Sequence, residues 1–324
     1  MHAILCHRFG PPSDLIYEEV EPLVAGPGQV VVDVKACGVN FPDLLIVQGK
    51  YQFKPPFPFS PGGEVAGVVS SIGKGVQGVE VGSRVVGIGV AGGFADQMLL
   101  PAAALVPMPD GMDFQTASAF TLTYATSLYA LQDRAQLKAG ETVLVLGAAG
   151  GVGLASIDVA KALGARVIAA ASTEAKLEQC RLAGADETIL YSEEDLKKRA
   201  KALTGGGGVD VVVDPVGGDF AEQALRAIGW EGRFLVIGFA SGEIPRIPLN
   251  LMLLKGCQVI GVFWGSMIAR EPKRSAEHHR QLREWFADGT CTPFVSKTYP
   301  LSEAAQALED LEARRVIGKV VLLP

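Results

Sequence analysis

The sequence predicts an α/β protein of two domains, one of antiparallel barrel-type strands and one with a doubly wound parallel sheet. Three observations lead to this prediction. The chain has 324 residues, enough for two domains of ordinary size. Short β-branched runs broken by Gly and Pro fill its first third. From Gln132 onward, strand-length apolar runs alternate with stretches of helical period.

The first third reads as the antiparallel domain. Its clearest strand candidates are residues 29–35, 64–70 and 83–88, which are rich in Val and Ile. Turn signals such as residues 26–28 and 61–63 separate them. Short strands punctuated in this way are typical of a barrel-type fold.

The second half reads as the parallel sheet. Near-continuous Val, Ile and Leu runs indicate strands buried on both faces. The strand candidates are residues 142–147, 165–170, 187–190, 209–214, 233–238 and 258–263. The clearest helices are residues 152–163 and 173–183, with Gly164 and Gly184 where C-caps are expected. A charged helix over residues 272–288 and a final strand over 318–323 follow, and periodicity leaves open where this tail packs.

Composition narrows the function classes. Lys plus Arg is 29 and Asp plus Glu is 35, so the net charge is −6 and no nucleic-acid partner is expected. No apolar run approaches the roughly 20 residues of a membrane span. The start lacks the pattern of a secretory signal, and the five scattered cysteines form no C-x-x-C pair. We therefore expect a cytoplasmic protein without disulfides.

The strongest local signal is a glycine-rich turn between the strand at 142–147 and the helix that follows. Gly147 permits the turn, Gly150 lets a pyrophosphate approach, and Gly153 lets the helix pack closely. Ala148 stands where the strict pattern has glycine, and no Lys-Ser or Lys-Thr follows, which excludes a phosphate-loop NTPase. The alternative is a turn without a ligand. The predicted cofactor residues here are Gly147, Gly150, Gly151, Val152 and Gly153.

The end of the second strand indicates which nicotinamide cofactor binds. An enzyme that prefers NAD carries an acid here to hold the ribose hydroxyl, but this chain has Ala171. Ser172, Thr173 and Lys176 suit the extra phosphate of NADPH. In the alternative interpretation, Ser172 only caps the helix and Lys176 is solvated. We predict NADPH.

Several motifs together carry a resemblance over essentially the whole chain. They are residues 38–43 (GVNFPD), 48–51 (QGKY), 61–67 (PGGEVAG), 81–86 (VGSRVV), 137–143 (LKAGETV), the glycine-rich turn and 318–322 (GKVVL). The chain resembles the medium-chain dehydrogenase/reductase superfamily, within it the zinc-free quinone oxidoreductase (zeta-crystallin-like) branch. The resemblance implies a GroES-like catalytic domain over residues 1–121 and 265–324. It also implies an NADPH-binding Rossmann domain over 122–264 and a homodimer formed through the cofactor domains.

The zinc ligands of related alcohol dehydrogenases are missing. Asn40 stands in place of a ligating Cys and Gly63 in place of a His, and the lobe of four closely spaced cysteines is absent. Of the four histidines, His278 and His279 lie in the charged helix, where we expect them to be solvated. Zinc needs about four N or S ligands, or three plus water. The sequence therefore predicts no metal site.

The missing metal limits the reaction. An isolated ketone needs charge stabilisation at its oxygen, whereas a quinone or an α,β-unsaturated carbonyl spreads the charge itself. We expect hydride transfer from NADPH to a quinone, with a small apolar conjugated carbonyl as the substrate class. One alternative is a reductase of activated C=C bonds, in 2-alkenals or enoyl thioesters. The other is a cofactor-binding structural protein, as the lens crystallins of this family illustrate.

The remaining candidates follow from the resemblance. Asn40 and Tyr51 match catalytic polar positions at the nicotinamide and substrate, and Tyr51 matches a proposed proton donor of enoyl-thioester reductases. Alternatively, Tyr51 packs under the loop at 55–58 and Asn40 satisfies a turn. Cys37 is expected to fill a buried position rather than act as a nucleophile. The cofactor residues that the resemblance adds are Thr126, Tyr191, Phe239 and Lys319.

Overall fold

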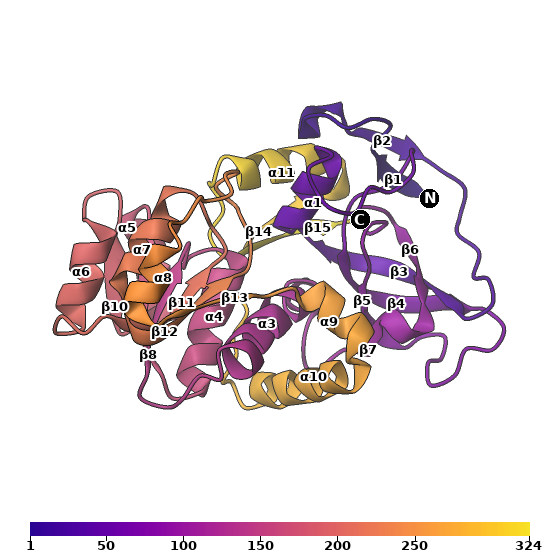
Figure 1. The fold of residues 1–324 in the computed structure, drawn as a ribbon. Helices are drawn as coiled ribbons and strands as arrows, with labels where there is room; N and C mark the ends of the chain where they lie inside the picture. The colour runs from indigo at the N-terminus through magenta and orange to yellow at the C-terminus, as the bar shows by residue number, and fades with distance from the viewer. The chain divides into compact units, whose positions relative to one another are not determined.

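The computed structural model describes residues 1–324, which divide into two compact units (Figure 1). Unit 1 comprises Met1–Leu122 and Phe294–Pro324, and unit 2 comprises Thr123–Pro293. Unit 1 contains a sheet that is antiparallel in all but one of its strand pairings, and unit 2 contains a parallel sheet. The predicted α/β fold class, with a doubly wound parallel sheet in one of the two parts, is confirmed.

The parallel sheet of unit 2 has six strands in the order β10-β9-β8-β11-β12-β13. They are β8 (Thr142–Leu146), β9 (Arg166–Ala171), β10 (Glu187–Leu190), β11 (Val209–Asp214), β12 (Ile228–Val236) and β13 (Gln258–Gly261). The strand order reverses between β8 and β11. The carboxyl ends of these two strands therefore form the topological switch point of a Rossmann sheet. Val143 to Val145 and Val211 to Val213 are fully buried, as strands covered on both faces require.

Helices connect and cover these strands (Figure 1). They are α3 (Thr121–Leu128), α4 (Gly151–Ala162), α5 (Glu174–Leu182), α6 (Leu196–Leu203), α7 (Asp219–Ala227), α8 (Asn250–Lys255), α9 (Trp264–Arg270) and α10 (Pro272–Ala287). One turn of π-helix, η3 (Tyr129–Arg134), follows α3. Gly164 and Gly184 adopt positive φ angles of 80° and 95° just beyond α4 and α5, as C-terminal glycines do.

The seven-stranded sheet of unit 1 follows the order β14-β15-β3-β4-β5-β7, with β6 paired to β3. The strands are β3 (Gln29–Gly38), β4 (Glu64–Ile72), β5 (Arg84–Ile88), β6 (Gln97–Pro101), β7 (Leu105–Pro107), β14 (Val295–Pro300) and β15 (Lys319–Leu323). A small sheet of β1 (His2–Leu5) and β2 (Ile16–Glu19) and the helices α1 (Phe41–Val47), α2 (Phe114–Ala117) and α11 (Ala304–Glu312) complete the unit. The end of the chain therefore returns to its first third.

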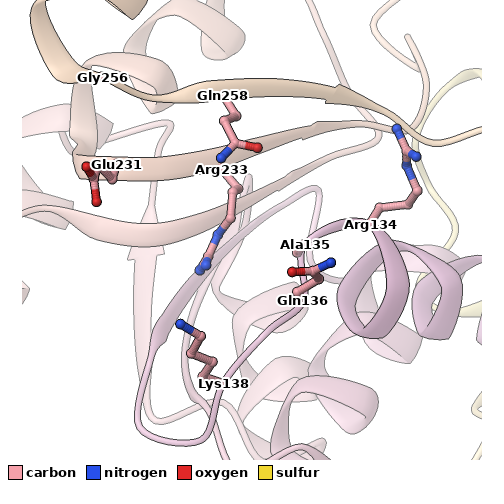
Figure 2. A pocket seen from close by; sticks show the side chains of 8 residues that line it. All are labelled: Arg134, Ala135, Gln136, Lys138, Glu231, Arg233, Gly256 and Gln258. Atoms are coloured by element: carbon pink, nitrogen blue, oxygen red, sulfur yellow. The ribbon is translucent and has the colours of Figure 1, made fainter.

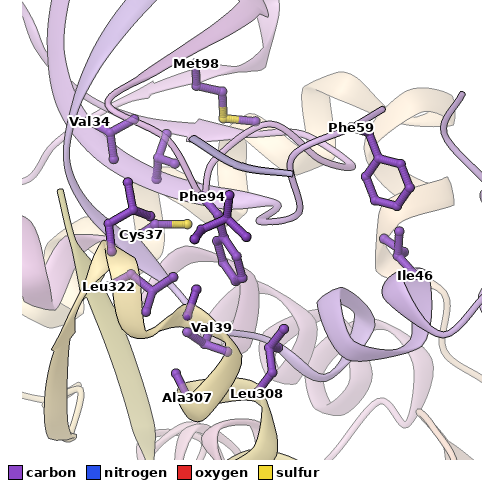
Figure 3. Close-up of a cluster of buried hydrophobic side chains, with 14 of the residues drawn as sticks. Val34, Cys37, Val39, Ile46, Phe59, Phe94, Met98, Ala307, Leu308 and Leu322 are labelled. Atoms are coloured by element: carbon purple, nitrogen blue, oxygen red, sulfur yellow. The ribbon is translucent and has the colours of Figure 1, made fainter. Parts of the chain in front are cut away.

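The core of unit 1 joins these distant segments (Figure 3). Cys37 and Val39 of the β3 end lie among Phe94, Leu308 of α11 and Leu322 of β15, all buried. In the sheet, Leu322 is paired with Cys37, and Cys37 is also paired with Val65 of β4. The three strand ends that carry Asn40, Glu64 and Lys319 are thus held side by side.

The second domain boundary differs from the sequence expectation. Residues 265–293 were expected to join the catalytic domain, but α9 and α10 belong to unit 2. His278 of α10 is buried, with Nε2 3.0 Å from Asp133 Oδ2, and Gln281 donates to Gln132 at 3.1 Å. These contacts to η3 are long-range, so helical periodicity could not reveal them. The expectation that His278 is solvated is therefore wrong, and His279 is itself half-buried.

The thiols are sheltered. All five cysteines are free, and only Cys257 is not fully buried. Burial raises the pKa of each one, including Cys37 in the core of unit 1. Cys37 therefore fills a buried position, as expected, and is a poor nucleophile at neutral pH.

Candidate active site

The glycine turn (residues 147–153) begins where β8 ends. Gly147 adopts a φ of +56°, and its carbonyl accepts the Gly150 N–H at 2.9 Å. A Cβ on Gly153 would lie 2.4 Å from that carbonyl oxygen, so helix α4 can pack on the turn only with glycine there. Ala148 is fully buried and donates its N–H to Ala170, which explains why a side chain is tolerated in place of the usual glycine.

The turn has the features of an anion-binding site. A Cβ on Gly150 would be 3.4 Å from the nearest protein atom other than its neighbours, so this glycine is not required by crowding within the protein. It caps α4, a helix of 12 residues whose first N–H groups, on Gly151 and Val152, have no partner inside the helix. Such groups bind phosphate. The turn also lies at the switch point, because a Cβ on Gly147 would lie 2.7 Å from Val216 in the loop after β11.

The end of β9 lies beside this turn because β8 and β9 are neighbours. Ala171 is buried and offers no carboxylate, and the nearby Glu174 pairs with Arg181 at 2.7 Å. Thr173, not Ser172, caps α5, accepting the N–H of Lys176 at 3.3 Å. Lys176 Nζ instead lies 3.4 Å from Ser172 Oγ, so the two predicted phosphate contacts adjoin. The alternative in which Ser172 caps the helix is wrong.

The other predicted cofactor residues of unit 2 occupy strand ends or α3. Tyr191 follows β10 and lies with its ring 4.4 Å from Phe220, and Phe239 follows β12 and lies against Gly217. Thr126 is buried in α3. Its neighbour Ser127 contacts the Val152 carbonyl at 3.3 Å, which brings this helix to the first turn of α4.

The predicted polar residues of unit 1 belong to a buried cluster. We call Asn40, Asp43, Glu64 and Lys319 the Asn40 cluster; all are at most 6% exposed. Asn40 Nδ2 donates to Gly38 O at 3.1 Å and to Glu64 Oε2 at 3.2 Å. Lys319 Nζ donates to Asn40 Oδ1 at 2.5 Å and to Val39 O at 2.9 Å. Both amide N–H bonds of Asn40 are therefore already used within the protein.

Charges are closely matched in this cluster. Lys319 Nζ lies 3.7 Å from Glu64 Oε2, and Glu64 Oε1 accepts the Leu122 N–H at 2.7 Å. Asp43 accepts from the N–H groups of Asn40 at 2.8 Å and Gly63 at 3.1 Å. Burial raises the pKa of Asp43 to about 7 and also raises the pKa of Glu64, and it lowers the pKa of Lys319.

Asp43 and Glu64 were not singled out from the sequence. Each stands in a motif that carried the resemblance, but nothing local distinguishes them from surface acids. Their burial arises from the pairing of β3 with β4 and β15, which are far apart in the chain. The glycines beside them, as in residues 61–67, were the available signal.

Tyr51 lies near this cluster. Its side chain is half-buried, with its ring 6.2 Å from Phe53, and its hydroxyl makes no hydrogen bond within the protein. Burial and then the charge of Asp43 raise the pKa of Tyr51. The hydroxyl therefore keeps its proton at neutral pH, which a proton donor requires.

The donor set does not fit zinc. Asn40 and Gly63 provide neither a thiolate nor an imidazole, and no group of three or more His, Cys, Asp or Glu is placed to hold a metal ion. No helix is both long and apolar enough to cross a membrane.

Comparisons with known proteins agree with this architecture. Residues 26–110 match the alcohol dehydrogenase GroES-like domain, and residues 151–279 match the family described as zinc-binding dehydrogenase. A quinone oxidoreductase-like protein 2 homolog of Nematostella vectensis is 39% identical, covering 99% of this chain and 88% of that protein. A quinone oxidoreductase of Pseudomonas aeruginosa is 35% identical over 98% of this chain and 97% of its own.

A solved structure extends the agreement. The quinone oxidoreductase of Escherichia coli complexed with NADPH superposes with a TM-score of 0.94 at 33% identity, over 100% of both chains. Together, the glycine turn, the switch point and these relatives define an oxidoreductase of the medium-chain dehydrogenase/reductase superfamily. Within it, the chain belongs to the quinone oxidoreductase family.

Proposed function

We propose that the protein transfers hydride from NADPH to a quinone without the help of a metal ion. The observation that carries this proposal is the Asn40 cluster. Its centre holds the Lys319 ammonium, which three oxygens surround, in a region where zinc-dependent relatives would need thiolate and imidazole. A quinone suits such a site because the ring spreads the negative charge that hydride brings.

The residues of unit 2 fit NADPH. The N–H groups of Gly151 and Val152 would hold the pyrophosphate, and the Ser172–Lys176 corner would hold the 2′-phosphate. NADPH, when bound, supplies the hydride. By family resemblance, Thr126 would lie at the nicotinamide, with Tyr191 and Phe239 along the rest of the cofactor.

The residues of unit 1 would orient the acceptor and supply a proton. Asn40 and Lys319 satisfy each other, so we assign Lys319 to positioning the Asn40 amide rather than to direct contact with the cofactor. The Tyr51 hydroxyl, protonated and without a partner in the protein, is the candidate proton donor for an acceptor that must be protonated at carbon.

A homodimer through unit 2 is part of the proposal. The edge strand β13, helix α8 with its N-cap residue, and the neighbouring strand β12 expose large apolar side chains. These are Trp230, Leu249, Leu253, Leu254 and Val259, between 42% and 80% exposed. An exposed apolar surface beside an unpaired strand is typical of an interface. Sedimentation at micromolar concentration should give twice the chain mass, and Leu253→Glu should give the single chain.

An acceptor screen with NADPH and NADH in parallel tests the reaction. We expect rapid stopped-flow oxidation of NADPH by simple quinones. Clear turnover of 2-alkenals or enoyl thioesters without turnover of any quinone would favour the C=C reductase instead. Tight NADPH binding with no hydride transfer to any acceptor would favour a structural role.

Tyr51→Phe separates the two reductase hypotheses further. Reduction of a C=C bond needs a proton at carbon, so it should slow by about tenfold or more, in the range of general-acid effects. Quinone reduction should change little, because a quinol anion can take its proton from water. An equal loss with both acceptors would contradict this division of labour.

A further inference from the structure

A polar hollow of about 390 Å³ lies on unit 2, away from the residues discussed above (Figure 2). We call it the basic hollow. Its lining residues come from the end of η3 and the segment that follows it, from β12 and from the start of β13. They are Arg134, Ala135, Gln136, Lys138, Glu231, Arg233, Gly256 and Gln258.

The basic hollow is distinct from the cofactor turn. Lys138 precedes the first residue of β8, and Arg233 is paired with Gln258 at the start of β13. The glycine turn follows the last residue of β8. Because the strands are parallel, the hollow and the turn lie at opposite ends of the sheet.

Cations outnumber acids in the basic hollow. Figure 2 shows the Arg233 and Lys138 side chains extending toward one another from opposite walls. Lys138 Nζ has no acidic partner, and Arg134 donates only its Nε–H, to Gly261 O at 3.2 Å. Glu141 serves both walls. Its Oε2 accepts the Lys138 backbone N–H at 2.8 Å and its Oε1 lies 2.8 Å from Arg233 Nη2.

Neither Nε nor Nη2 of Arg233 makes a hydrogen bond, although both atoms are buried. The guanidinium forms an ion pair with Glu141, Nη2 lying 2.8 Å from Oε1. The carboxylates of Glu141 and Glu231 face three cations, so positive charge is left uncompensated, and an oxyanion would balance it.

The backbone of the basic hollow is also unusual. Only three residues other than glycine have positive φ, and two of them, Gln136 at 50° and Glu231 at 58°, line this hollow. Non-glycine residues in this conformation are strained and concentrate at ligand sites. The lining is polar, so a ligand must be recognised by charge rather than by apolar burial.

We propose that the basic hollow binds a small polyanion carrying phosphate or carboxylate groups through Arg134, Lys138 and Arg233. The site lies outside the proposed reaction, so it would take a ligand other than the reacting quinone or NADPH. Arg and Lys match both oxyanion types, the fork of Arg in bidentate geometry and Lys as a point charge.

Calorimetric titration at low salt tests this proposal, with the protein saturated in NADPH so that anions cannot occupy the cofactor turn. Pyrophosphate and citrate are the two probes, and they separate phosphate from carboxylate recognition. We expect saturable binding of at least one. Lys138→Gln should weaken it about tenfold, and Lys138→Gln with Arg134→Gln should weaken it about a hundredfold. Both side chains are exposed, so folding should be kept.

Lys273→Gln is the matched control, because Lys273 is an exposed lysine of α10 outside the hollow. It should leave the affinity unchanged. The proposal is overturned if neither anion binds saturably. It is equally overturned if the double variant binds as tightly as the native protein, since the anion then sits elsewhere.

Discussion

The glycine turn of unit 2 is held by its backbone, whereas the Asn40 cluster of unit 1 is held by charged side chains. In the turn, carbonyls and N–H groups approach so closely that Gly153 has no room for a Cβ. In the cluster, Lys319 lies between Asn40 and Glu64, all buried. A ligand's phosphates need open N–H groups, which a bare backbone provides. A buried charge needs its partners inside the protein, and the side chains of the cluster therefore contact one another.

Removing the Lys319 ammonium from the Asn40 cluster should cause the largest loss of stability. Lys319→Met leaves Glu64 buried without its ion-pair partner, which typically costs 3–5 kcal/mol. We expect urea unfolding to report a loss of about 4 kcal/mol. The double variant Lys319→Met with Glu64→Gln should recover part of it, because the buried charge is then gone. A single variant no less stable than Lys273→Met would contradict the pairing.

The glycine turn should be destabilised by an added side-chain atom rather than by the loss of a charge. Gly153→Ala places a Cβ 2.4 Å from Gly147 O, and backbone cannot yield cheaply. We expect a loss of about 2 kcal/mol in the free energy of unfolding, as for other overpacked sites.

Gly150→Ala is the matched control for the turn. Its Cβ would meet nothing closer than 3.4 Å, so stability should hardly change. NADPH affinity, measured by fluorescence titration, should nevertheless fall, because the new methyl group faces the proposed pyrophosphate. Unaltered affinity would place the phosphates elsewhere.

Lys176→Ala tests the preference for NADPH over NADH. Losing one charged contact to the 2′-phosphate should raise the Michaelis constant for NADPH about tenfold. The constant for NADH should change less than about twofold, since NADH lacks that phosphate. Arg181→Ala, an exposed change on the same helix, is the control. Equal use of both cofactors by the native protein would count against the assignment.

The contribution of Asp43 to the stability of the protein should depend on pH. Burial raises its pKa to about 7, so the folded protein keeps a proton that the unfolded chain releases above its ordinary pKa near 4. The contribution of Asp43 to stability is therefore present below about pH 4 and is lost as pH rises to about 7.

Relative to the native protein, Asp43→Asn should gain stability by about 1 kcal/mol per pH unit across this window. Urea unfolding between pH 4.5 and 7.5 measures the difference. Asp158 in unit 2 accepts from the Tyr124 hydroxyl, and burial raises the pKa of Asp158 to about 6. The corresponding gain for Asp158→Asn should therefore end about one unit lower. Parallel pH profiles of the native protein and Asp43→Asn would show that Asp43 is ionised throughout.

The contrast between the glycine turn and the Asn40 cluster also explains which features could be predicted from the sequence. The turn could be predicted because each backbone requirement appears as a glycine within one short segment, from Gly147 to Gly153. The strand ends around it followed from apolar runs, and the Ser172–Lys176 corner from its place after the second strand. The α/β class rested on these local signals.

The cluster was not readable, because its members meet only through pairing between distant strands. Asn40 and Lys319 were identified by resemblance, but Asp43 and Glu64 look like ordinary acids until β3, β4 and β15 bury them. The same limit explains His278, whose burial against Asp133 also moves α10 into unit 2.

The sheltered thiols have a consequence for a protein that handles quinones or enals. Such compounds are electrophiles that alkylate exposed thiolates, and a thiolate forms readily only where a cysteine is accessible and its pKa is low. Here four of the five cysteines are buried, and every pKa is raised. If the proposed function holds, the chain would resist alkylation by its acceptors, with Cys257 the position where covalent damage would begin.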